Sequence, residues 1–151
     1  GYAATTLALF VSVIAIYNLT GKDEISDFDG LSQRAPFVAL VISSALFSLA
    51  GLPFFAGFIT KFYLFTAVAA EGFLWLTALA ILNSLISLYY YLSIIRHMYI
   101  VPSPEGTQER LSIPLLTKGV LGALLLAIVV IGVYPAPLMD AIVTARSAIL
   151  P

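Results

Sequence analysis

Charged residues in this sequence are crowded into short stretches, which leaves four long tracts without any charge. No Asp, Glu, Lys or Arg occurs within residues 1–21, 35–60, 72–95 and 119–139. Each tract meets or exceeds the roughly 20 residues that a helix needs to cross the hydrocarbon core of a membrane. Only 10% of the residues are charged, against about 25% in a typical soluble domain. The sequence therefore predicts an all-α fold, a polytopic transmembrane helix bundle with about four spans.

The four predicted spans form a single membrane domain over residues 1–151. Their approximate bounds are 1–20, 36–70, 72–97 and 117–134. After the last span, residues 138–149 place apolar and polar side chains on opposite helical faces, which predicts a short C-terminal interfacial helix. The chain opens on Gly1 and has no basic stretch ahead of an apolar core, so its first span does not read as a signal peptide. We expect a fragment of a larger protein.

The second predicted span is too long for one straight helix. Residues 35–70 carry a single charge, Lys61, and as a continuous helix they would reach about 54 Å against a hydrocarbon core of about 30 Å. Pro53 removes a backbone donor and crowds the preceding turn, while Gly51 and Gly57 permit unusual backbone angles. These residues predict a discontinuous helix, broken near 51–57.

Two arrangements fit this interruption: a single broken crossing, or a hairpin that turns at Pro53. With a single crossing, one side of the membrane holds five basic residues against Arg146 on the other: Lys22, Arg34, Arg96, Arg110 and Lys118. With a hairpin the split is three to three. The tendency of basic residues to gather on one side favours the single broken crossing.

Lys61 is the outstanding candidate for chemistry, because a charged side chain inside the membrane costs on the order of 2.5–3.5 kcal/mol. One interpretation is a lysine near a helix end whose long stem reaches the interface. The other is a proton carrier, because a broken helix leaves backbone groups that protein or water must satisfy. No carboxylate in this chain shares the expected depth of Lys61. A carboxylate that controls its charge would therefore come from elsewhere.

A polar stripe runs along the third predicted span. At 100° per residue its members fall within about a third of the helix circumference; they are Asn83, Ser84, Ser87, Tyr90 and Tyr91. One interpretation is interhelical hydrogen bonding. The other is a lining for a proton path that meets Lys61.

Other polar and small residues have two possible roles. His97 could relay protons, because its unperturbed pKa is near 6.5, but its place beside Arg96 at a helix end favours an interfacial residue. Packing between helices is the expected role of Ser43, Ser44, Ser48, Gly119 and Ala123.

Composition excludes several classes of site. The sequence has no cysteine and a single histidine, so it offers neither thiolates for iron–sulfur clusters nor enough imidazoles for a haem pair or a zinc cluster. We expect no metal or cofactor-binding site on this chain. The basic residues are few and scattered, so nucleic acid is not an expected partner.

Two segments around the break carry a family resemblance. Residues 46–53 read Leu-Phe-Ser-Leu-Ala-Gly-Leu-Pro and residues 56–65 read Ala-Gly-Phe-Ile-Thr-Lys-Phe-Tyr-Leu-Phe. They resemble the broken-helix signature of the antiporter-like subunits of complex I (NADH:quinone oxidoreductase). The tyrosines at 89–91, the acidic loop at 21–24 and the Tyr-Pro pair at 134–135 extend the match. Lys61, where the M-type subunit usually has Glu, points to the N-type; Phe54 departs from the common Pro-Pro pair.

The resemblance implies a proton-translocating subunit that couples quinone reduction to proton pumping. The full subunit would have about fourteen helices in two inverted repeats, of which this chain covers the last four. Lys61 would be the terminal lysine of the second half-channel. Flavin, iron–sulfur clusters and quinone would belong to other subunits, and the partners would be the other membrane subunits of complex I and the lipid bilayer. The expected location is a bacterial-type inner or cell membrane, or an energy-transducing organelle membrane.

Two other classes of function remain open from the sequence. One is a subunit of a Mrp-type cation/proton antiporter or of a membrane-bound hydrogenase, since these share the fold that the resemblance implies. The other is a structural membrane scaffold. Sequence upstream of this chain would separate an N-type subunit from an antiporter, and a scaffold would tolerate Lys61→Ala with full pumping.

Overall fold

A computed structural model describes the chain except for residues 23, 104–109, 138, 142–143 and 145–151. The described part is all-α, as the sequence predicted, and contains no strand. Its elements in chain order are α1 (Tyr2–Thr20), the 3₁₀ helix η1 (Ile25–Phe28), α2 (Leu31–Arg34), α3 (Pro36–Ala50), α4 (Ala56–Ala70), α5 (Leu74–Tyr99) and α6 (Leu115–Val133). Most of the predicted interfacial helix, 138–149, lies outside the described residues.

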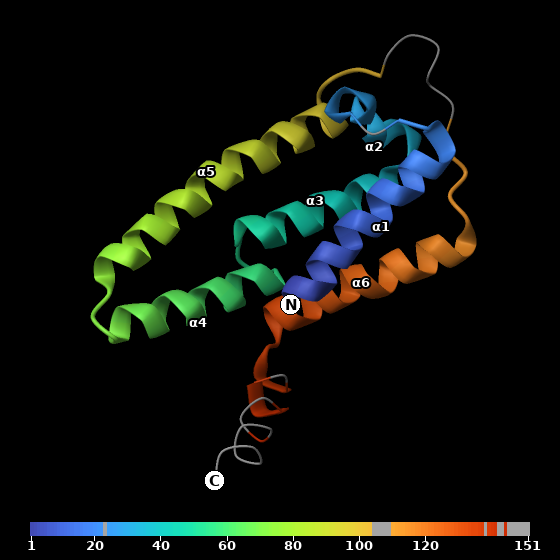
Figure 1. Cartoon of the computed structure of the whole chain (residues 1–151). Coiled ribbons are helices and arrows are strands. Elements are labelled where there is room, and N and C mark those ends of the chain that lie inside the picture. Colours follow the sequence, from blue (N-terminus) through green and yellow to red (C-terminus); the bar gives the residue numbers. More distant parts are fainter. Residues whose placement is uncertain (23, 104–109, 138, 142–143, 145–151) are drawn as a thin grey trace.

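The core of the molecule lies between α1, α3 and α6, which pack on one another (Figure 1). Apolar side chains fill it, and the largest fully buried ones include Ile16, Ile42, Leu46, Leu121 and Ile128. The helices α4 and α5 form an outlying pair, in which the buried residues are Ala56 and Met98. A chain built this way leaves most of its apolar side chains on the outside.

The directions of the helices decide between the two arrangements of the broken span. Figure 1 shows α3 and α4 running the same way, with α5 returning alongside both. Two hydrogen bonds join the chain before α3 to the chain at and after the carboxyl end of α5. The Gly30 amide donates to the His97 carbonyl at 3.1 Å, and the Leu111 amide donates to the Arg34 carbonyl at 2.9 Å. The loops that follow α1 and α5 therefore share an end, as a single interrupted crossing requires and a hairpin does not.

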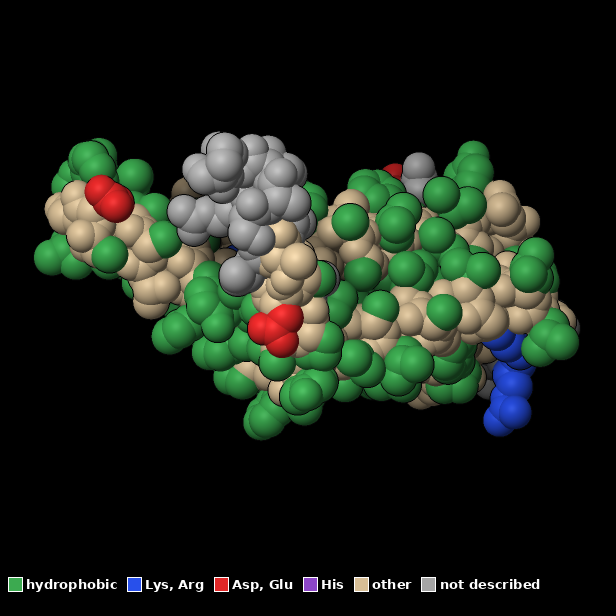
Figure 2. Space-filling view, turned by 90° about the horizontal axis from the view of Figure 1, so that it is seen from below, with side chains coloured by type: hydrophobic (Ala, Val, Ile, Leu, Met, Phe, Trp, Pro, Cys, Tyr) green, Lys and Arg blue, Asp and Glu red, His purple; other side chains and the backbone are tan. Residues whose placement is uncertain are grey.

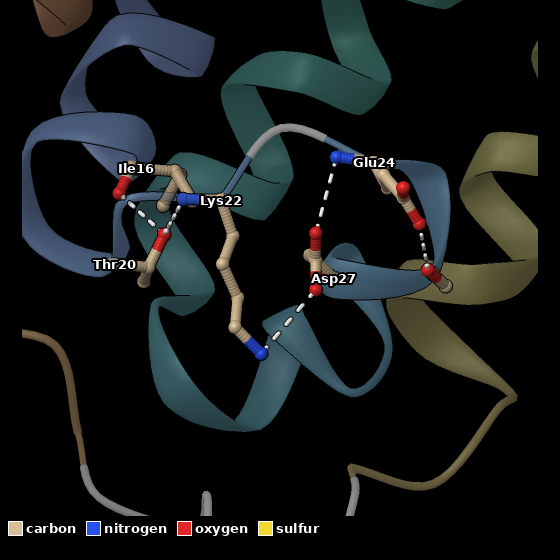
Figure 3. Close-up of polar contacts among 6 residues, drawn as sticks. Ile16, Thr20, Lys22, Glu24 and Asp27 are labelled. Carbon is tan, nitrogen blue, oxygen red and sulfur yellow. Dashed lines mark hydrogen bonds and ion pairs between the residues drawn. The ribbon is translucent and has the colours of Figure 1, made fainter.

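The loop between α1 and α2 is more ordered than its charge and turn residues suggest. Thr20 Oγ1 donates to the Ile16 carbonyl at 2.9 Å and accepts the Lys22 amide at 3.3 Å (Figure 3). The Glu24 amide donates to Asp27 Oδ2 at 3.1 Å, and Lys22 Nζ lies 3.5 Å from Asp27 Oδ1. These contacts stabilise η1, a short helix that the sequence did not predict.

The outer surface is that of an integral membrane protein. In the described part, α1, α5 and α6 are each long and apolar enough to cross a membrane, and α3 and α4 are shorter apolar helices. Figure 2 shows hydrophobic side chains over most of one face, with Lys and Arg side chains at one end. Because so much apolar surface would be unfavourable in water, this surface belongs in lipid or against other protein.

Candidate functional site at the helix break

The break begins with a left-handed turn at the carboxyl end of α3. Gly51 has φ of +85°, which glycine adopts without steric penalty. Its amide donates to the Ser48 carbonyl at 3.0 Å, and the Leu52 amide donates to the Phe47 carbonyl at 3.0 Å. This pair of bonds is a Schellman motif. It stops α3 while the Ala50 carbonyl still points out of the helix end.

Phe54 gives the break an unusual backbone. Its φ is +74°, the one positive value at a non-glycine residue in the described part of the chain. Such a conformation costs on the order of 1–3 kcal/mol and persists only where the surroundings impose it. A proline at this position could not adopt it, because its ring fixes φ near −65°. Because Phe54 stands where a Pro-Pro pair would have its second proline, the backbone at residue 54 differs from that of such a pair.

Ser48 joins the end of α3 to the start of α4. Its buried Oγ accepts the Gly57 amide at 3.0 Å and lies 2.9 Å from Thr5 Oγ1 on α1. The Gly57 amide is one of the donors that the first turn of any helix leaves without an intrahelical partner. A Cβ atom at residue 57 would collide with the Ser48 carbonyl. Glycine is required there, and Ser48 caps α4 rather than merely filling space.

Lys61 completes the other half of the break. Its Nζ donates to the Ala50 carbonyl at 3.2 Å and to Ser84 Oγ on α5, and Ser84 Oγ lies 3.5 Å from the same carbonyl. The last carbonyls of a helix lack intrahelical partners and carry the negative end of its dipole. The ammonium of Lys61 is therefore bound at a position that favours positive charge. Lys61 ties α3, α4 and α5 together.

The site of Lys61 is partly open. Lys61 is of intermediate exposure within this chain. The side chain lines two cavities, one of about 380 Å³ against α1 and one of about 250 Å³ beside the Gly51 turn. Several residues that line the larger cavity carry hydroxyl groups: Tyr2, Thr5, Thr6, Ser48, Thr60 and Tyr91.

One residue that lines the larger cavity has a hydroxyl group without a hydrogen-bond partner in the described part of the chain. Thr6 Oγ1 is buried and has no hydrogen-bond partner among the described residues. Buried polar groups without protein partners are the groups that internal water satisfies, given a polar cavity of sufficient volume. The lining of the larger cavity is mostly apolar but includes hydroxyl-bearing residues, and its volume is sufficient for water beside Lys61.

The predicted polar stripe of α5 divides into two sets. Ser84 bonds Lys61, and Tyr91 lines the larger cavity with it. Asn83 and Tyr90 are exposed, and Ser87 Oγ donates back to the Asn83 carbonyl at 3.0 Å. Ser84 and Tyr91 are seven residues apart and share one edge of the stripe, whereas the other three lie farther round the helix. The structure brings only that edge to Lys61.

The remaining predicted positions lie away from Lys61. His97 Nδ1 contacts Asp29 Oδ1 at the end of the bundle, a pair that no sequence pattern indicated. Ser43 Oγ donates to the Ala39 carbonyl of its own helix at 2.8 Å. The ion pairs found in the described residues are Lys22–Asp27 and His97–Asp29, so Lys61 has no carboxylate partner there.

Comparison with known proteins places this site in a family of membrane subunits. The family described as NADH:quinone oxidoreductase/Mrp antiporter, TM matches residues 1–87, more than half of the chain. The chain belongs to this family. NADH-quinone oxidoreductase subunit N of Moorella thermoacetica is 40% identical over 139 residues, which is 92% of this chain and 29% of that protein. F(420)H(2) dehydrogenase subunit N of Methanosarcina mazei is 36% identical over 149 residues, 99% of this chain and 30% of that protein.

The antiporter-like fold is also found in a solved structure. The Mrp complex from Dietzia sp. superposes with a TM-score of 0.81 at 22% identity, over 91% of this chain and 34% of that one. At this identity the likeness concerns the fold. The chain matches the C-terminal part of its sequence relatives and spans about 30% of their length. Its helix bundle therefore corresponds to the C-terminal part of these antiporter-like membrane subunits.

Proposed function

We propose that this chain is part of a proton-translocating membrane subunit of an NADH:quinone oxidoreductase, and that Lys61 carries the proton. The observation that carries the proposal is the position of Lys61, which lines two cavities at a helix break and binds the Ala50 carbonyl. The identity of 36–40% to subunits named N over most of the chain favours a redox-driven complex over a cation/proton antiporter.

The proposed step is a proton transfer through one amine. Neutral Lys61 accepts one proton from water in one cavity and becomes an ammonium, and it later releases one proton into the other cavity. The first transfer breaks an O–H bond of the donor water chain and forms an N–H bond, and the second breaks an N–H bond and forms an O–H bond on the accepting water. The side chain returns to its starting state. The Ala50 carbonyl and Ser84 Oγ hold the ammonium between these events.

The energy for this step would come from other subunits. This chain has no cysteine and one histidine, a poor donor set for iron–sulfur or haem iron. We therefore assign flavin, iron–sulfur clusters and the quinone site to partner subunits of the assembly. The carboxylate that controls the charge of Lys61 would likewise lie outside this chain, in the rest of the same subunit or on a neighbouring one.

Purification and substitution together test the proposal. A tagged full-length subunit should co-purify with peripheral iron–sulfur subunits; purification with antiporter subunits alone would assign it to a cation/proton antiporter. In the assembled complex, Lys61→Ala should lower proton pumping and quinone reductase activity while NADH oxidation by artificial acceptors continues. Full pumping with Lys61→Ala would instead indicate a membrane scaffold.

A further inference from the structure

Helix α6 meets the break at a close main-chain contact. Gly132 is buried near the carboxyl end of α6, and Figure 1 shows that end beside the start of α4. A Cβ atom at residue 132 would overlap main-chain atoms of Phe54 and Phe55. Those atoms belong to the backbone, so an added methyl group could be accommodated only by moving the break or α6.

The segment that Gly132 contacts is already constrained. Phe54 holds a left-handed conformation although the residue is 72% exposed, so burial does not account for the strain. The start of α4 is also in close contact with α3, where Gly57 lies against the Ser48 carbonyl. Main-chain contacts therefore hold the break against both α6 and α3, so an atom added at residue 132 would push on the segment that leads into α4.

The hydrogen bond of Lys61 depends on the position of the break. Lys61 lies about one helical turn after Gly57, while its Nζ bonds the Ala50 carbonyl on the other side of the break. The length and angle of that hydrogen bond depend on how the two half-helices sit relative to each other. A shift of residues 54–55 changes this relation directly.

We propose that Gly132 is a positioning residue for Lys61, in that its missing side chain lets α6 set the geometry of the break. The proposal rests on the proton-carrying role proposed above. It assigns to α6 a part in proton transfer although α6 contributes no side chain to either cavity that Lys61 lines.

The helix supplies its own controls. A Cβ atom added at Gly119 would have no neighbouring atom within 4 Å, and at Gly122 the nearest atom would be Phe37 Cζ at 3.8 Å, an ordinary contact. Gly119→Ala and Gly122→Ala replace glycine by alanine in the same helix as Gly132→Ala and so change its helix propensity equally. Neither added methyl group contacts the break. Phe54→Gly removes the strain of the left-handed residue and lets the segment move away from an added methyl group.

The experiment compares these variants in the assembled complex in membrane vesicles. Proton pumping is divided by NADH oxidation with an artificial acceptor, which corrects for assembly. Gly132→Ala should lower this ratio by about tenfold or more, as expected when a reacting group is misplaced by about 1 Å. Gly119→Ala and Gly122→Ala should leave this ratio unchanged. The double variant Gly132→Ala with Phe54→Gly should have at least half of the wild-type ratio.

Each outcome decides one question. A wild-type ratio in Gly132→Ala overturns the positioning role, and so does a loss that Phe54→Gly fails to restore. If Gly132→Ala does not assemble, the double variant decides alone: an assembled, pumping complex supports the proposal, and any other result overturns it. Lys61→Ala is measured in parallel; full pumping in that variant overturns the proton-carrying role itself, whatever Gly132→Ala does.

Discussion

Lys61 Nζ on α4 donates to the carbonyl of Ala50, the last residue of α3, at 3.2 Å. Across the same break, Ser48 on α3 accepts the amide of Gly57 on α4 at 3.0 Å. Each half-helix thus supplies the polar group that the end of the other half-helix lacks. A break at membrane depth is tolerated only when its freed backbone groups are satisfied by protein or water, and this reciprocal pair meets part of that requirement.

The Ser48 cap should be measurable as stability. Ser48→Ala leaves the Gly57 amide without its acceptor and should lower the free energy of unfolding by about 0.5–2 kcal/mol. Ser43→Ala is the matched control, because Ser43 Oγ donates to the Ala39 carbonyl within its own helix. Thermal denaturation of the purified complex should show a lower midpoint for Ser48→Ala than for Ser43→Ala. Equal midpoints would argue against a capping role.

The two serines of the α5 stripe should differ in their effect on pumping. Ser84→Ala removes a hydroxyl that Lys61 Nζ contacts and should slow pumping by about three- to tenfold, the range that a membrane hydrogen bond of about 0.6–1.4 kcal/mol gives. Ser87→Ala should have a smaller effect, because that hydroxyl returns to the Asn83 carbonyl at 3.0 Å. Pumping rates of the two variants in vesicles check this, and a larger loss in Ser87→Ala would contradict it.

The pair of Asp29 and His97 should stabilise the end of the bundle where the loops meet. Its side chains are 17% and 29% exposed, so a double-mutant cycle of Asp29→Asn and His97→Ala should give a coupling of about 1–2 kcal/mol. In the Lys22–Asp27 pair the lysine is 62% exposed, and a cycle there should give less than about 0.5 kcal/mol. Equal couplings in unfolding experiments would show that partial burial gives the Asp29–His97 pair no advantage over the exposed Lys22–Asp27 pair.

The single interrupted crossing fixes which loops share a side of the membrane. Because the chain has no cysteine, single cysteines report accessibility without background. Ile25→Cys and Glu105→Cys should react with an impermeant thiol reagent from one side, and Glu71→Cys from the other. Labelling of residues 25 and 105 from opposite sides would contradict the single crossing and support the hairpin arrangement.

The sequence predicted the helices well because charge and backbone chemistry determine them. The predicted all-α bundle is confirmed, and the interruption of its second span falls between the end of α3 at Ala50 and the start of α4 at Ala56, on either side of Pro53. The partner of Lys61 was not predictable, because the Ala50 carbonyl belongs to the backbone and carries no signal in the residue type. The contact of Asp29 with His97 joins residues 68 apart in sequence, which periodicity within one helix cannot detect.

The stripe on α5 shows where helical periodicity stops being informative. The 100° rule placed five polar residues on one side of the helix, but only the edge with Ser84 and Tyr91 meets α4 and the larger cavity. Which edge makes contact depends on how α5 is rotated against α3 and α4. That rotation is set by tertiary packing.

The comparison of Lys61→Arg with wild type tests the proton-carrying role most directly. Arginine can still donate to the Ala50 carbonyl and keep the break closed, but its guanidinium stays protonated at any accessible pH and cannot release a proton. In the assembled complex, Lys61→Arg should therefore assemble normally and lose proton pumping by about tenfold or more, the scale of a lost proton-transfer group. Wild-type pumping in Lys61→Arg would show that Lys61 serves only as a fixed positive charge and would contradict the account.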